Sequence, residues 1–317
     1  MRFLSCLFFL SVTFSFSPAA EPQVIPLWPE GVPDLKADGG PEKDDQGRYS
    51  NIHHPSITVF APPAGKANGT AIVFAAGGGY QRVAVGLNGG GITTWLNSLG
   101  VTVFMLKYRA VEYGHPAPLR DALRAMRVVR SRAAEWNLDP KRIGMLGGSA
   151  GAHLTASAGT LFDAPEGRLG AEIDQVSARP DFMVLIFPVI TMQDPYAHGA
   201  SRKNLLGAAP SAEVKQRMSV DEQVTKDTSP AFLVHSSEDT TAVVENSLLF
   251  YQAMRRAKVP IEMHLYPKGP HGSGMDPKLG PISEWPKLCE KWMRFNGWLP
   301  EAESAAKATA VGPAVAK

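Results

Sequence analysis

Seven short runs of almost continuously apolar residues most constrain the fold of this chain. Longer segments separate them, and in these apolar residues recur every three or four positions. Runs that are apolar throughout are typical of strands buried on both faces of a parallel sheet, whereas the three- and four-residue spacing is typical of helices with one buried face. The runs cover residues 56–61, 70–75, 101–108, 142–146, 181–187, 231–235 and 261–266.

The alternation of strands and helices predicts an α/β fold. We expect a three-layer sandwich, in which a mainly parallel sheet is flanked by helices, formed as one domain over residues 55–299. The 317 residues, 44% hydrophobic and 20% charged, suit a globular chain with a sizeable core. In such sheets a functional site forms at the carboxyl ends of the strands. Helices are expected over residues 119–133, 153–161, 240–257 and 284–298.

The two ends of the chain have different compositions from this domain. Residues 1–20 combine Arg2, an apolar run and small residues up to Ala20, which predicts a secretory signal peptide and a secreted or periplasmic protein. The alternative is an uncleaved anchor helix, for which the apolar run is short. Residues 21–54 are rich in Pro, Gly and charge and are expected to wrap the surface before the sheet begins. Residues 300–317 are Ala-rich and predict a disordered tail.

Charge and cysteine content exclude several classes of function. The formal net charge is +2, without a long Lys/Arg run, so no nucleic-acid partner is expected. Without residues 1–20 the chain retains only Cys289, which excludes an internal disulfide and is expected to be a buried, inert thiol. There is no HExxH or paired CxxC pattern, so we predict no catalytic metal and no cofactor.

The sequence GGSAG over residues 147–151 joins the expected strand 142–146 to a helical segment. This G-x-S-x-G pattern between a strand and a helix is the setting of a nucleophile elbow, where a sharp turn exposes the serine hydroxyl above the sheet. The alternative is a phosphate-binding loop, but no lysine follows the glycines. Ser149 is therefore the predicted nucleophile.

A second glycine run, AGGGY over residues 76–80, follows the expected strand 70–75. Backbone N–H groups aimed at a developing oxyanion lower the barrier to acyl transfer, and glycines let the backbone approach the substrate closely. We expect the N–H groups of Gly78, Gly79 and Ala150 to form an oxyanion hole. The alternative is a flexible tight turn.

Two pairs of residues near these glycines have predicted supporting roles. Tyr80 and Arg82 follow the glycine run and are predicted to bind substrate, the alternative being surface side chains of a loop. Tyr108 and Arg109 end a strand and are expected to form hydrogen bonds that support the site from beneath.

A serine nucleophile needs a base, and the base needs an orienting carboxylate. In this type of fold both follow the serine, the acid first. Asp239, just after strand 231–235, is the predicted acid, although it is also a candidate helix N-cap. Glu238 and then Asp194 are the competing carboxylates.

His271 is the predicted base. It lies in the Gly/Pro-rich sequence PKGPHG that follows strand 261–266, where a loop can bring the ring above the sheet edge. His264 lies within that strand, and His153 lies one helical turn after Ser149. Both are expected to pack rather than react.

At these residues the chain resembles the acetylxylan-esterase-like and feruloyl-esterase-like branch of the α/β-hydrolases. The resemblance covers residues 24–299, with Ala76 where the family usually has His or Pro and with Gly148 where it often has an aromatic residue. Gly148 is expected to open space beside the nucleophile. The matching segments are 25–34, 51–63, 75–84, 95–109, 119–154 and 266–272.

This resemblance implies a secreted serine esterase that hydrolyses ester groups, chiefly acetyl, on xylan or related oligosaccharides. Its expected partner is a small-molecule or polysaccharide ester, with no membrane association after signal cleavage. The alternatives are a general carboxylesterase, a feruloyl-type esterase and a serine peptidase. The alternative outside these enzyme classes is a non-catalytic hydrolase fold that binds glycans.

Overall fold

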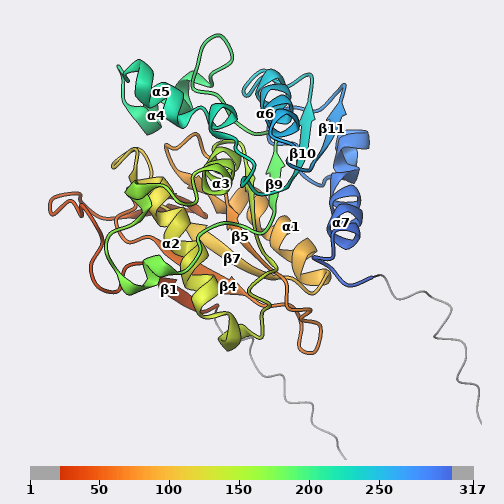
Figure 1. The fold of residues 1–317 in the computed structure, drawn as a ribbon, viewed down its shortest axis with the longest axis horizontal. Helices are drawn as coiled ribbons and strands as arrows, with labels where there is room; N and C mark the ends of the chain where they lie inside the picture. The colour runs from red at the N-terminus through yellow and green to blue at the C-terminus, as the bar shows by residue number, and fades with distance from the viewer. Residues whose placement is uncertain (1–21, 302–317) are drawn as a thin grey trace, which may run out of the picture.

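The computed structural model of the protein describes residues 22–301, apart from the side chains of residues 87–90. The predicted signal peptide, and all of the predicted tail beyond its first two residues, lie outside the described residues. Figure 1 shows a central sheet with helices packed on both sides. This arrangement confirms the predicted three-layer α/β fold.

The central sheet has eight strands in the order β1-β4-β7-β5-β8-β9-β10-β11. From β7 to β11 all neighbours are parallel, whereas β1 and β4 add an antiparallel edge. All seven predicted strands are present, with ends within two residues of those expected. The eight strands of the sheet, which are these seven and β1, have the bounds β1 Val24–Pro26, β4 Ser56–Phe60, β5 Ala71–Ala75, β7 Thr102–Lys107, β8 Ile143–Gly148, β9 Met183–Ile186, β10 Ala231–Ser236 and β11 Ile261–Tyr266.

The helices form two layers, α2, α3 and α6 on one side of the sheet and α1 and α7 on the other (Figure 1). Trp95 of α1 and Trp285 of α7 pack edge to face, with ring centroids 5.1 Å apart. This division follows from right-handed crossovers between parallel strands. The chain passes through α1 from β5 to β7, and then runs in the opposite direction along the sheet, through α2 to β8 and through α3 to β9. Because the direction reverses, α2 and α3 lie on the opposite face from α1. The bounds are α1 Val85–Ser98, α2 Ala117–Ser131, α3 Ala150–Thr160, α6 Glu245–Arg256 and α7 Trp285–Phe295.

Several elements were not apparent in the sequence. Helix α1 contains four glycines, which oppose helix formation, but its burial beside Trp285 compensates. The insertion between β9 and β10 forms two helices, and a small three-stranded sheet lies outside the main one. The bounds are α4 Gly199–Leu206, α5 Ala212–Met218, β2 Lys43–Asp45, β3 Arg48–Ser50 and β6 Val83–Ala84, with 3₁₀ helices η1 Ala133–Trp136, η2 Pro165–Gly167, η3 Glu172–Gln175, η4 Val220–Gln223 and η5 Pro277–Glu284.

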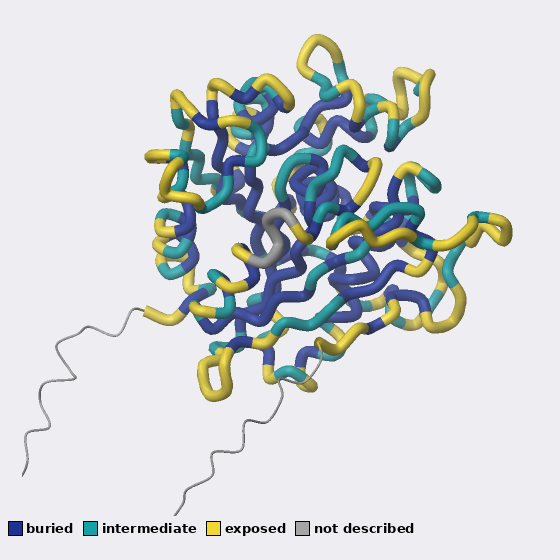
Figure 2. Tube along the Cα trace, turned by 180° about the vertical axis from the view of Figure 1, so that it is seen from behind, coloured by how far each residue is buried: buried dark blue, intermediate teal, exposed yellow. Residues whose placement is uncertain are grey.

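The N-terminal segment does more than wrap the surface. Strand β1 pairs with β4, with Ile25 opposite Ile57, and so extends the main sheet. Leu27 and Ile52 are fully buried in the core. Figure 2 shows the buried interior of the sheet surrounded by exposed connecting loops. The expectation that residues 21–54 precede the sheet is therefore wrong, because their apolar residues are spaced too sparsely to reveal a three-residue edge strand.

A buried ion pair joins β7 to α2. Arg109 follows β7 and forms a bidentate pair with Asp121 of α2, with N···O distances of 2.8 and 3.0 Å, and both side chains are fully buried. Asp121 also accepts a hydrogen bond from the indole of Trp28 in the N-terminal segment. Arg109 donates to the carbonyl of Pro33 as well. One carboxylate therefore links the sheet, a helix and the N-terminal segment.

The substitution Asp121→Asn is expected to lower the free energy of unfolding by about 3–5 kcal/mol, because it leaves the Arg109 guanidinium buried without a counter-charge. Urea unfolding followed by circular dichroism measures this change. The matched control is Lys226→Ala, which breaks the exposed pair with Asp227 and should leave the unfolding midpoint unchanged. Equal stability of Asp121→Asn and the wild type would contradict the structural role given to the buried pair.

Candidate active site

Ser149 occupies a strained turn between β8 and α3. Its φ of 56° and ψ of −124° are rarely adopted by residues with a side chain. A Cβ on Gly147 would lie 2.2 Å from the carbonyl oxygen of Gly151, and a Cβ on Gly151 would lie 2.1 Å from that of Ala75. Both flanking positions of the G-x-S-x-G pattern thus require glycine, and the turn holds the hydroxyl at the carboxyl end of the sheet.

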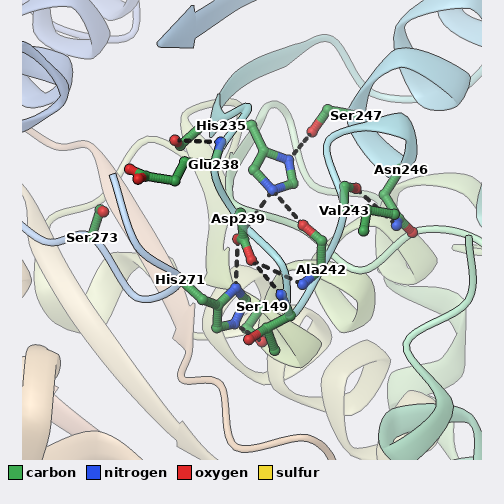
Figure 3. Close-up of polar contacts among 12 residues, drawn as sticks. Ser149, His235, Glu238, Asp239, Ala242, Val243, Asn246, Ser247, His271 and Ser273 are labelled. Atoms are coloured by element: carbon green, nitrogen blue, oxygen red, sulfur yellow. Dashed lines mark hydrogen bonds and ion pairs between the residues drawn. The ribbon is translucent and has the colours of Figure 1, made fainter. Parts of the chain in front are cut away.

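Ser149, His271 and Asp239 form a continuous hydrogen-bonded chain. The Ser149 hydroxyl lies 2.8 Å from Nε2 of His271, and Nδ1 of His271 lies 2.6 Å from Oδ2 of Asp239. Figure 3 shows the three side chains directed toward one another. The structure therefore brings together the three residues predicted to act as nucleophile, base and acid. It can do so because β8, β10 and β11 run parallel and end at the same edge.

The Asp239 carboxylate is buried and has every acceptor position filled. Oδ1 accepts the N–H groups of Thr241 and Ala242, at 2.8 and 3.0 Å, and Oδ2 accepts from His271 and His235. Burial alone would raise the pKa of Asp239, but the hydrogen bonds from His235 and His271 outweigh it and hold the pKa well below the usual range. Asp239 is not the N-cap of α6, which begins at Glu245. A fixed, ionised acceptor is what an orienting carboxylate must be.

His235, at the end of β10, is a second histidine on this carboxylate that the sequence reading missed. Its Nε2 lies 3.2 Å from Oδ2 of Asp239 and 2.8 Å from the carbonyl oxygen of Ala242. Both partners are acceptors, so Nε2 carries a hydrogen. Nδ1 is bonded to the hydroxyl of Ser247 at 2.6 Å. The available signal was a polar residue in an otherwise apolar strand, four positions before the acid.

The competing carboxylates lie away from His271. Glu238 is exposed and accepts the N–H of Gly269 at 3.1 Å, which fixes the loop that carries His271. Asp194 is exposed and pairs with Arg202 at 3.0 Å. Neither contacts the imidazole, so the geometry favours Asp239 as the orienting acid.

The predicted oxyanion loop lies opposite the nucleophile. Gly78 and Gly79 both have positive φ values, 137° and 63°, and a Cβ on Gly78 would lie 2.2 Å from the carbonyl oxygen of Arg82. Within residues 22–301, neither glycine N–H donates to a backbone carbonyl. The N–H of Ala150 is the first of α3 and has no intrahelical acceptor. These three donors are therefore available to a ligand.

Tyr80 does not line the pocket, contrary to the prediction. Its side chain is buried, and its hydroxyl donates to Nδ1 of His153 at 2.7 Å, while Nε2 of His153 donates to the carbonyl of Met218 at 2.8 Å. Burial lowers the pKa of His153 to about 4, so the ring can accept from Tyr80. Tyr80 also has a positive φ of 57°, which few residues with a side chain adopt. This contact anchors the oxyanion loop to α3.

Arg82 and Tyr108 lie where the sequence places them. Arg82 lines the cavity beside the glycine loop. The Tyr108 hydroxyl donates to the carbonyl of Ala76 at 2.8 Å and supports the loop from beneath. Ala76 stands where the family that this chain resembles usually has Pro or His, and here Tyr108, the residue after β7, restrains the loop.

A cavity of about 510 Å³ opens above Ser149. Phe74, Ile92, Met275 and Trp285 supply apolar walls, whereas the polar lining includes Arg82, His198 and Thr241. Such a mainly apolar cleft with a few polar groups is typical of small-molecule sites.

The space beside Gly148 is filled, contrary to expectation. A Cβ on Gly148 would lie 3.3 Å from the ring of Phe187, which comes from the loop after β9. The same ring packs edge to face on His271, with centroids 5.0 Å apart. An aromatic side chain from the loop after β9 thus occupies the space beside Gly148.

Metal-dependent and cysteine-dependent chemistry have little support among the described residues. Among residues 22–301, no group of three or more His, Cys, Asp and Glu side chains is arranged to hold a metal ion. Cys289 is buried, and burial raises the pKa of its thiol well above the ordinary value. The helices of this region are too short or too polar to cross a membrane.

Several curated proteins share sequence with this chain, and two of them have names that refer to xylan. It is 32% identical to an acetylxylan esterase of Xylanibacter ruminicola over 65% of its length, and 39% identical to endo-1,4-beta-xylanase B of Butyrivibrio fibrisolvens over 50%. The chain spans only 42% of the first protein and 25% of the second.

A solved structure matches nearly the whole described fold. The acetyl ester-xyloside bifunctional hydrolase of Caldicellulosiruptor lactoaceticus is 38% identical, with a TM-score of 0.77, and the match covers 87% of this chain and 97% of that one. The model of the BD-FAE family matches residues 57–254, which include Ser149 and Asp239. The chain therefore belongs to the BD-FAE family and is an acetylxylan-esterase-like α/β-hydrolase, one of the carboxylic ester hydrolases.

Proposed function

We propose that this protein is a serine esterase that removes acyl groups, chiefly acetyl, from xylan or related oligosaccharides through a Ser149–His271–Asp239 triad. The observation that carries the proposal is the hydrogen-bonded chain of these side chains, with distances of 2.8 and 2.6 Å, at the base of a cavity. All three positions are filled by competent groups, which argues against a non-catalytic glycan-binding role.

In the proposed reaction His271 takes the proton of Ser149 as the hydroxyl attacks the ester carbonyl. Asp239 keeps Nδ1 of the imidazole protonated and stabilises the imidazolium that forms. The N–H groups of Gly78, Gly79 and Ala150 receive the oxyanion. His271 then protonates the departing alcohol, and water releases the acyl group from Ser149 by the reverse use of the same groups.

Relatives support the substrate class. One is named an acetylxylan esterase, another an endo-1,4-beta-xylanase, and the matched solved structure an acetyl ester-xyloside hydrolase. The chain covers less than half of the first two, so the activity of those whole proteins is not transferred. A xylose-based substrate is common to the three names, and an acetyl ester is common to two of them.

The cavity favours a second candidate, an esterase for a bulkier acyl group. Its volume of about 510 Å³ greatly exceeds an acetyl group, and Phe74, Ile92 and Trp285 give it apolar walls suited to an aromatic acid. A feruloyl-type or general carboxylic ester would fill this space better than acetate does.

Ser149→Ala is expected to lower kcat by about 10⁴-fold or more on every ester tested, because no other group forms the acyl-enzyme. Acetate release from acetylated xylan and from 4-nitrophenyl acetate, alongside ferulate release from methyl ferulate, separates the candidates. The proposal is supported if the wild type releases acetate from acetylated xylan and Ser149→Ala has lost activity on all of these esters. Wild-type activity on the small esters alone would reject xylan, and labelling of Ser149→Ala by a fluorophosphonate probe would reject the nucleophile.

Asp239→Asn is expected to lower kcat by about 10⁴-fold, because an amide no longer fixes the reactive tautomer of His271. The matched control is Glu238→Gln, whose amide oxygen still accepts from Gly269, and its kcat should remain within a few-fold of the wild type. Steady-state kinetics on 4-nitrophenyl acetate measure both. A larger loss in Glu238→Gln than in Asp239→Asn would reverse the assignment of the acid.

We also propose that residues 1–20 direct export and are removed near Ala20, on the strength of their residue pattern alone. The protein recovered outside the cytoplasm is expected to begin close to Glu21. N-terminal sequencing of that fraction tests this. A membrane-bound chain that still carries residues 1–20 would instead indicate an anchor.

A further inference from the structure

His198 lines the catalytic cavity but has no part in the triad. It is the N-cap of α4, in the insertion between β9 and β10, and it is half-buried. Its Nδ1 lies 2.8 Å from the hydroxyl of Ser201 and receives the N–H of Ser201 at 3.4 Å. A histidine is an unusual residue at an N-cap, where Ser, Thr, Asp and Asn are preferred.

This cap fixes the tautomer of the ring. A backbone N–H can only donate, so Nδ1 of His198 must be the acceptor, and the single ring hydrogen lies on Nε2. Burial lowers the pKa of His198, the neighbouring His271 lowers it further, and Asp239 opposes the effect. The ring is therefore uncharged at neutral pH and offers one N–H donor on the side away from the helix.

The position of His198 is fixed relative to the reaction centre. Asn204 of the same helix donates to the carbonyl of Gly79 at 2.8 Å, so α4 is attached to the oxyanion loop. His198, His271 and Ser149 all line this one cavity. Since His271 protonates the departing alcohol, the alcohol part of an ester must lie in this cavity, which His198 also lines.

We propose that Nε2–H of His198 is a substrate-binding donor that selects esters of polyhydroxylated alcohols, by bonding a sugar oxygen next to the ester being cleaved. The inference rests on the proposed esterase activity and deepens it. An aryl or simple alkyl alcohol has no such oxygen and gains nothing from the donor. The apolar walls of the cavity are then available to contact the acyl group.

Two substitutions separate the cap from the donor. An Asn side chain reproduces the Nδ1 position and is itself a favoured N-cap, whereas it does not reach as far as Nε2. A Gln side chain reaches the Nε2 position with an amide N–H and loses the cap. His198→Asn therefore retains the helix terminus without the donor, and His198→Gln does the reverse.

The test compares a monoacetylated methyl xyloside with its deoxy analogue, which lacks the hydroxyl next to the ester. In His198→Asn, kcat/KM for the hydroxylated substrate is expected to fall about tenfold more than for the deoxy analogue, mainly through KM. His198→Gln should keep most of the wild-type preference while melting at a lower temperature. The matched control is Ser211→Ala, which removes the N-cap of the adjacent α5 and should lower stability without changing the preference.

Equal losses on both xylosides in His198→Asn, or an equal loss of preference in His198→Gln, would overturn the donor role and leave His198 as a cap. Failure of the proposed function looks different. In that case the wild type cleaves 4-nitrophenyl acetate but neither xyloside, and sugar esters are rejected as the substrate class.

Discussion

Parallel pairing of β5, β8, β9, β10 and β11 is the constraint on which the rest of the structure depends. It brings the ends of these strands to one edge, so residues separated by more than a hundred positions meet within hydrogen-bonding distance. The oxyanion loop follows β5, Ser149 follows β8, Asp239 follows β10 and His271 follows β11. A shift in register between β8 and β11 would separate Ser149, Asp239 and His271, and a shift between β5 and β8 would displace the glycine loop from Ser149. The apolar packing of the strands therefore maintains the geometry of the site.

Steric exclusion at the turn around Ser149 adds a second constraint to the pairing of the strands. The carbonyl of Ala75 lies where a side chain on Gly151 would project, so the strand that carries the oxyanion loop packs directly against the start of α3. This contact sets the distance between the oxyanion donors and the nucleophile. The Tyr80–His153 hydrogen bond and the Tyr108 contact to Ala76 then fix the orientation of the loop. The N–H groups proposed as oxyanion donors are thus held in place before substrate arrives, as preorganised stabilisation of an oxyanion requires.

The elements that could be predicted from the sequence are those whose pattern lies within a few neighbouring residues. The seven buried strands, the elbow glycines and the loops bearing Asp239 and His271 each have a pattern confined to a few residues. Contacts between distant segments left no such signal. Helix α1 is rich in glycine, but its Trp95 packs on Trp285 of α7. Tyr80 is buried against His153, and Phe187 reaches the elbow from the loop after β9. His235 and His198 are polar residues whose partners are set only by the folded chain.

Helix α4 contacts the oxyanion loop and also contributes a side chain to the lining of the cavity. Its Asn204 holds the carbonyl of Gly79 in the oxyanion loop, and its N-cap His198 faces the cavity beside His271. If the proposed roles of His198 and of the oxyanion loop hold, substrate choice and transition-state stabilisation both depend on this one short helix in the insertion between β9 and β10. Sequence drift in that insertion would alter both properties together, which couples the evolution of specificity to that of rate. Exchanging this insertion between relatives would therefore change substrate choice and rate together, and not substrate choice alone.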